Sequence, residues 1–326
     1  MSATADRDQV VAVIVESQPL QSSLHAATRT LHSQLNANII KRLPQCLPPQ
    51  AQDPTSYHLG MLTFGQIFVA FEKGIEDALN EHGHSLEAER ARQVRILEAL
   101  HTRGLARTIR LKHDADTLSL RLFSSKSVNE VGVLRQVEGK LRSDVHAKTR
   151  QITDRVRQKP YLALAYSWTM YLALFNGGRH IHRALQRAGP GFWLEAEQEA
   201  TGEENNVLTF WRFEAATDED PEADQLKLEF KTRFDEATQL LTVGERDEVV
   251  VEAKSIFDLC MEQVEFLDGV MRDYAQDAAQ AVALHDLNQP DTQSNTWSSI
   301  ASGMLAPLDQ LLNLGWGRLR VEEVKE

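Results

Sequence analysis

The chain has 326 residues, of which 42% are hydrophobic and 25% charged, which suits one large domain with a substantial core. A formal net charge of -12 argues against nucleic acid as a general partner, because phosphate binding depends on clustered lysine and arginine. Two cysteines, Cys46 and Cys260, exclude a disulfide framework and a cysteine-rich zinc site. Low cysteine usage without a signal-peptide pattern favours a cytoplasmic location.

Apolar residues three and four positions apart predict helices through the first half of the chain. Prolines then mark where helices cannot continue, and Pro160 is suited to begin one. The predicted elements, in chain order, are a helix over residues 24–39, a proline-rich loop over 42–54, and helices over 61–79, about 86–106 and about 128–158.

The helix expected after Pro160 carries two adjacent glycines, Gly177 and Gly178, near its end. A glycine inside a helix costs about 0.5–1 kcal/mol relative to alanine, so the pair needs a reason. Either the helix ends there, or its backbone bends and approaches something flat. An acidic loop region follows, and further helices are predicted from about residue 226 and over about 249–267.

No alternating strand pattern and no internal repeat is present, so we expect an all-α protein. The expected organisation is a flexible N-terminus over residues 1–20, one domain over 21–275 and a C-terminal extension over 276–326. The extension contains an amphipathic segment with Ile300, Met304 and Leu308 on one side. We expect it to pack on the body or a partner; weak, peripheral membrane contact is the alternative, with few cations to support it.

Histidine and lysine pairs are the polar features that stand out from this pattern. His32 lies one position past the first apolar stripe, with His25 seven residues earlier on about the same face. From the pattern alone, His32 is a boundary histidine hydrogen-bonded at the edge of a core. Lys227 and Lys231 are four apart and share a helix face, as either a solvated stripe or a clamp for an anionic ligand.

Four segments, "LHAATRTLHSQLN", "FVAFEKGIE", "YLALFNGG" and "VEAKSIF", resemble motifs of the haem oxygenases and occur in the same order as in that family. The proline-rich loop and the acidic insert are similar to the fungal branch of the family. The segment "LHAATRTLHSQLN" resembles the family's L-x-x-A-T-x-x-x-H, and "FVAFEKGIE" resembles Y-V-A-L-E-x-x-I-E. The segment "YLALFNGG" resembles the distal-helix motif Y-L-G-D-L-S-G-G. The segment "VEAKSIF", which ends at Phe257, is similar to E-E-A-K-x-x-F.

The resemblance implies a single-domain helical bundle with haem b between a proximal helix and a kinked distal helix. His32 takes the place of the proximal iron ligand. The positions of His25, Lys227, Lys231 and Phe257 match cofactor-binding positions, the first three at the haem propionates. Haem is then both cofactor and substrate, and is cleaved to biliverdin, iron and carbon monoxide with oxygen and electrons from a reductase.

The distal motif assigns catalytic positions to Asn176, Gly177 and Gly178, but it also departs from the family. Its first glycine is Ala173 here, and its aspartate, which organises proton-delivering waters, is Leu174. The leading hypothesis is therefore a haem-binding protein of this family that oxidatively cleaves haem. Two alternatives stay open: a non-catalytic haem sensor or buffer, and a helical interaction protein without haem.

Overall fold

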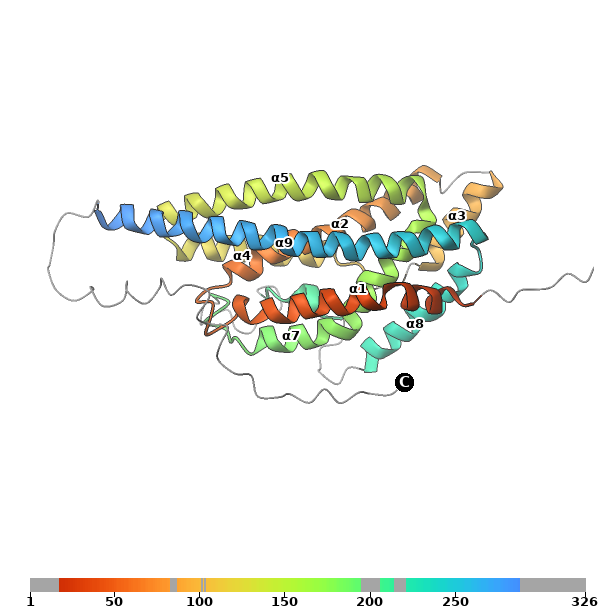
Figure 1. The fold of residues 1–326 in the computed structure, drawn as a ribbon, viewed down its shortest axis with the longest axis horizontal. Coiled ribbons are helices and arrows are strands. Elements are labelled where there is room, and N and C mark those ends of the chain that lie inside the picture. The colour runs from red at the N-terminus through yellow and green to blue at the C-terminus, as the bar shows by residue number, and fades with distance from the viewer. Residues whose placement is uncertain are drawn as a thin grey trace, which may run out of the picture. The chain divides into compact units, whose positions relative to one another are not determined.

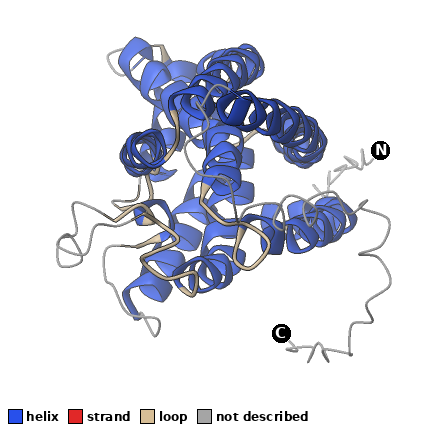
Figure 2. Cartoon of the chain, turned by 90° about the vertical axis from the view of Figure 1, so that its left-hand side faces the viewer, coloured by secondary structure: helices blue, strands red, loops and turns tan. Residues whose placement is uncertain are grey.

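A computed structural model of the protein describes residues 18–82, 87–100, 102, 104–194, 206–213 and 221–287 (Figure 1). Contacts within the chain define two units, Met1–Val282 and Ala283–Glu326. Every regular element of the described residues is a helix (Figure 2), as predicted. None of these helices is both long enough and apolar enough to cross a membrane.

The first half of the chain forms long helices whose positions largely agree with the predicted ones. The helix α4 was not predicted, although Leu111, Ala115, Leu118 and Leu122 follow helical spacing along its buried face; the polar Asp114 and Ser119 are buried on the same face. The elements are α1 (Leu20–Arg42), η1 (Leu43–Cys46), α2 (Thr55–His82), α3 (Ala88–Leu100), α4 (Thr108–Ser125) and α5 (Val128–Gln158).

The second half begins at Pro160, as predicted, with a run of short helical pieces that continue one another. Two of these, η3 and η4, are π-helical, and we call residues 167–178 the distal helix. The elements are η2 (Pro160–Leu162), α6 (Ala163–Tyr166), η3 (Ser167–Tyr171), η4 (Leu174–Gly178), α7 (Arg179–Gln186), η6 (Thr209–Trp211), α8 (Pro221–Thr238) and α9 (Val243–Leu287).

Helix α9 continues past residue 275, where the predicted C-terminal extension begins. The amphipathic segment around Ile300 lies outside the described residues, as do residues 1–17 and most of the acidic insert. The proposed limits of the N-terminal and C-terminal segments therefore stay predictions.

Helices α2 and α5 pack closely along one another. At Gly74 of α2, an added Cβ would lie 2.8 Å from Cβ of Val156 and 3.0 Å from the carbonyl oxygen of Thr153, both on α5. Only glycine permits this approach. The start of α5 is fixed locally, because Ser127 and Glu130 form a reciprocal capping box.

Two tyrosines tie the distal helix and the residues before it to the long helices. The hydroxyl of Tyr166 donates to Oε1 of Glu252 on α9 at 2.6 Å, and that of Tyr171 donates to Oε1 of Glu72 on α2 at 3.0 Å. Burial and the neighbouring carboxylate raise the pKa of each phenol, so both hydroxyls remain donors at neutral pH. The distal helix is therefore held from two sides.

Candidate functional site

His32 lies in the exposed second half of α1. This helix buries only Leu20, Leu24 and Thr28, all in its first half. The imidazole of His32 meets the ring of Phe257 on α9 edge-on, with 6.1 Å between ring centroids. Among the described residues it has no hydrogen-bond or ion-pair partner, unlike the hydrogen-bonded histidine that the pattern alone suggested. Both ring nitrogens are therefore available to a ligand.

His25 is also exposed and lies seven residues before His32 on α1. Seven residues make about two helical turns, or about 10.5 Å along the axis, so both imidazoles project from a similar face. No other described residue contacts His25 through a hydrogen bond or ring contact. The structure therefore leaves a row of two available histidines on α1.

The glycine pair lies inside a continuous helix, because α7 follows directly at Arg179. The interpretation that the helix ends at the pair is therefore wrong. A Cβ added to the exposed Gly177 would meet no atom within 4 Å, and one on Gly178 would make ordinary contacts of 3.5 Å. The packing of the described residues thus does not require glycine at 177. The open backbone there is the kind of surface that a flat ligand can approach closely.

The exposed Asn176 is joined to α8. The Nζ atom of Lys227 donates to Oδ1 of Asn176 at 2.7 Å. The pKa of Lys227 is lowered by burial and by the nearby positive charges of Lys231 and Arg179. Three cations therefore gather beside the distal helix, and their mutual repulsion favours a bound anion there.

Arg179 is a member of this group that the sequence analysis missed. It directly follows the glycine pair, and that position was the available signal. It is half-buried and pairs with Asp224 at 2.5 Å. The ion pair connects the start of α7 with α8, so it also helps to fix the end of the distal helix.

Leu174, at the position of the family's aspartate, is buried in the main hydrophobic cluster. Its Cδ2 atom lies 3.5 Å from the position of a Cβ on Gly178. Glu72, the carboxylate that Tyr171 contacts, already accepts from the backbone N–H groups of Arg107 and Thr108. Leu174 has no carboxylate, and the carboxylate of Glu72 is already hydrogen-bonded. Neither residue therefore provides a free carboxylate at the exposed surface of the distal helix.

No family model matches the chain. It is 28% identical over 208 residues to the haem-binding protein HMX1 of Saccharomyces cerevisiae, and the aligned part covers 62% of each protein. Among solved structures, haem oxygenase-1 of the cyanobacterium Synechocystis in complex with haem superposes with a TM-score of 0.50. The identity is 20%, and the match covers 83% of this chain and 98% of that one.

Haem oxygenase-2 of Synechocystis, in complex with haem and NO, gives a TM-score of 0.51 at 16% identity. That match covers 81% of this chain and 93% of the other. The chain has the haem oxygenase fold. The predicted all-α class and the resemblance to this family are therefore confirmed.

Within the haem oxygenase fold, two contacts bring predicted site residues together. One is the ring contact of His32 with Phe257, and the other is the hydrogen bond between Lys227 and Asn176. His25 and Lys231 lie on the same helices, α1 and α8, without a direct contact to another predicted site residue. The site assignments themselves stay predictions.

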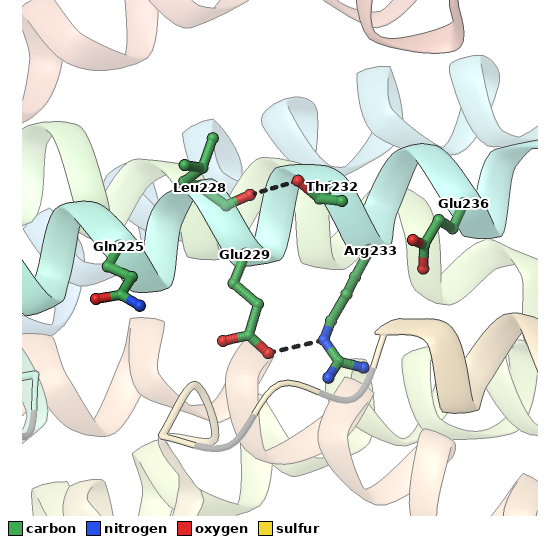
Figure 3. A pocket seen from close by; sticks show the side chains of 6 residues that line it. All are labelled: Gln225, Leu228, Glu229, Thr232, Arg233 and Glu236. Atoms are coloured by element: carbon green, nitrogen blue, oxygen red, sulfur yellow. Dashed lines mark hydrogen bonds and ion pairs between the residues drawn. The ribbon is translucent and has the colours of Figure 1, made fainter.

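A cavity of about 510 Å³ lies along α8 (Figure 3), but on a different face from Lys227 and Lys231. The ion pair of Arg233 with Glu229, 2.8 Å long, lies in this cavity. The residues that line the cavity are Gln225, Leu228, Glu229, Thr232, Arg233 and Glu236. The cavity is therefore separate from the cations beside Asn176.

Proposed function

We propose that the protein binds haem between α1 and the distal helix, where an imidazole nitrogen of His32 would bind the iron. The observation that carries the proposal is the exposed ring of His32, which touches Phe257 and has no polar partner among the described residues. A neutral imidazole of this kind is a common ligand of haem iron.

The remaining residues suit the other parts of a haem molecule. Lys227, Lys231 and Arg179 supply positive charge for the two propionates, and His25 can reach a propionate from α1. Phe257 offers an apolar contact to the macrocycle, and the open backbone at Gly177 admits its opposite face. Neither cysteine is in a C-x-x-C-H sequence, so the proposed ligand is non-covalent haem b.

Haem binding is the function that the geometry supports best. Bound haem would supply a redox-active iron at which oxygen can react. The chain would orient the macrocycle through His32 and the cations, and the buried Leu174 would keep water from the core side of the distal helix. A leucine cannot hold or move a proton, which favours the non-catalytic alternative, a haem sensor or buffer.

Oxidative haem cleavage with an external electron donor is the second candidate function. It is favoured by the exposed amide of Asn176 next to the open Gly177, since this amide can hydrogen-bond a distal water. The sequence similarity to a haem-binding protein supports binding but does not distinguish the two candidates.

The experiment for binding is a titration of the apoprotein with haem, followed by the Soret band. We expect saturable binding by the wild type and a loss of affinity on the order of tenfold or more in His32→Ala, since each tenfold corresponds to about 1.4 kcal/mol. The control is His146→Ala, which removes an exposed histidine of α5. Absence of a Soret change in the wild type would instead support the interaction protein without haem.

The experiment for cleavage exposes the haem complex to oxygen and a chemical reductant. Formation of a bilin and carbon monoxide would establish the enzyme, whereas a stable haem spectrum would establish the binder. In Leu174→Asp we expect bilin formation to rise if the site geometry is otherwise competent. Because an aspartate there is buried beside apolar groups, the stability of this variant must be measured first.

A further inference from the structure

A short segment between the distal helix and α8 is hydrogen-bonded to a buried carboxylate. This is the 206–213 segment, which includes η6. The Oδ1 atom of Asp114 accepts a hydrogen bond from Oγ1 of Thr209 at 2.5 Å, and its Oδ2 atom accepts from the backbone N–H of Phe210 at 2.8 Å. Asp114 is 2% exposed, so these bonds are shielded from water.

The other face of the 206–213 segment packs against the distal helix. Phe213 stacks on Phe175 with 4.6 Å between ring centroids and 8° between ring planes. The Cε3 atom of Trp211 lies 3.5 Å from the position of a Cβ on Gly178. The indole N–H of Trp211 also donates to the hydroxyl of Tyr57 on α2 at 2.8 Å, which fixes the orientation of this ring.

Arg107, just before α4, holds the same segment from its C-terminal side. Its Nη1 atom donates to the carbonyl oxygen of Arg212 at 2.7 Å, and its guanidinium lies 4.5 Å from the centroid of Phe213. Asp114 and Arg107 therefore fix the 206–213 segment at two points. A segment fixed in this way presents its aromatic rings as a firm surface to η4 (Leu174–Gly178).

The helix η4 needs such a surface more than an α-helix would. Its π-helical geometry is a rare departure from the regular hydrogen-bond pattern and depends on its surroundings. Phe175 faces the segment, whereas Asn176 and Gly177 are exposed on the side proposed to meet haem. Movement of the segment would therefore be passed to the haem-facing residues through Phe175 and Gly178.

We propose that Asp114 is a positioning residue of the distal helix: it holds the 206–213 segment, and the segment sets the place of η4 opposite the haem. The inference about haem rests on the proposed function. The inference about the distal helix does not, since every contact in it belongs to the protein itself.

The test compares three variants by hydrogen exchange of the apoprotein. In Asp114→Ala, the buried N–H of Phe210 loses its acceptor, and we expect the amides of residues 174–178 to exchange on the order of tenfold faster. Asp114→Asn can still accept from Phe210 and donate to Thr209, so we expect rates within about twofold of the wild type. The control is Asp116→Ala, an exposed site on the same helix.

A second comparison asks whether Asp114 acts through the aromatic contact. Phe213→Leu removes the stacking on Phe175, and we expect faster exchange at residues 174–178 in this variant as well. In the double variant that carries both Phe213→Leu and Asp114→Ala, the rise in exchange rate at residues 174–178 should be smaller than the two single effects combined. Both substitutions weaken the same contact between the 206–213 segment and the distal helix.

Two results would overturn the proposal. One is faster exchange of residues 206–213 in Asp114→Ala with unchanged rates at 174–178. The other is an equal rise in every helix, which would assign Asp114 to general stability. Haem affinity is measured in parallel, and we expect it to fall in Asp114→Ala and to be restored in Asp114→Asn. If the wild type binds no haem, the proposed function is wrong. The hydrogen-exchange rates of the apoprotein still test the role of Asp114 in that case.

Discussion

The two helices proposed to enclose haem are supported in opposite ways. Helix α1 buries three of its 23 residues, and its second half, which carries His32, is largely exposed. The distal helix is packed on aromatic rings and is held through Tyr171, Lys227 and the 206–213 segment. One wall of the proposed site is thus fixed by the protein, and the other has few contacts of its own.

Because of this difference, we expect a bound ligand to order α1 more than the distal helix. A ligand between the helices would add contacts mainly to α1, because the distal helix already has its packing partners. Elements with few buried contacts open at low free energy, so α1 is the part that a ligand can order.

The largest expected effect is on stability. Phe175→Ala removes a buried ring that stacks on Phe213, and we expect it to lower the free energy of unfolding by about 3–5 kcal/mol. Leu35→Ala, on the exposed half of α1, should lower it by about 1 kcal/mol or less. Urea denaturation measures both values. Equal losses would contradict the contrast between the helices.

The second prediction concerns pH. Burial raises the pKa of Asp114 from its ordinary 3.8 to about 6. The folded protein therefore binds this proton more tightly than the unfolded chain, and stability from Asp114 is present below pH 4 and lost as the pH rises through 6. The difference corresponds to about 3 kcal/mol. We therefore expect the free energy of unfolding of the wild type, minus that of Asp114→Asn, to fall as the pH rises from 4 to above 6. A rise over this range would contradict the raised pKa of Asp114.

The third prediction concerns the cations beside Asn176. Lys227→Met and Lys231→Met should each weaken haem binding by about three- to tenfold at low salt, because each removes a charge near the proposed propionate position. The effect should shrink as the salt concentration rises. The control is Lys140→Met, an exposed lysine of α5, for which a similar loss would indicate only a general effect of net charge.

The smallest effect is expected at the end of α1. Arg42 pairs with Asp268 of α9 at 2.6 Å, and the two side chains are 29% and 40% exposed. Such a half-exposed pair contributes little, so Arg42→Ala should lower the free energy of unfolding by about 1 kcal/mol or less. A loss as large as that of Phe175→Ala would show that α1 is held far more firmly than its burial indicates.

The sequence predicted helices best where local signals are strong. The limits of α5 follow from the capping box at Ser127 and the proline at 160, both readable from neighbouring residues. The glycine pair identified the distal helix as unusual, yet its π-helical form could not be predicted, because it depends on tertiary packing. Motif resemblance, rather than periodicity, predicted the haem oxygenase fold.

The parts that could not be predicted depend on contacts between distant residues. Asp114 is buried among the apolar residues of α4, and its partner Thr209 lies 95 positions later in the chain. Nothing in the local pattern around either residue shows this pairing. The same reason explains why Arg179 was missed, since its importance comes from α8, which follows a long insert.

The central claim is that His32 binds iron, and the vibrational spectrum of the ferrous haem complex tests it most directly. We expect the wild type to show an iron–histidine stretching band, and His32→Ala to lose that band and regain an axial nitrogen ligand when imidazole is added. The same band in His32→Ala without imidazole would show that another residue binds the iron and would contradict the claim.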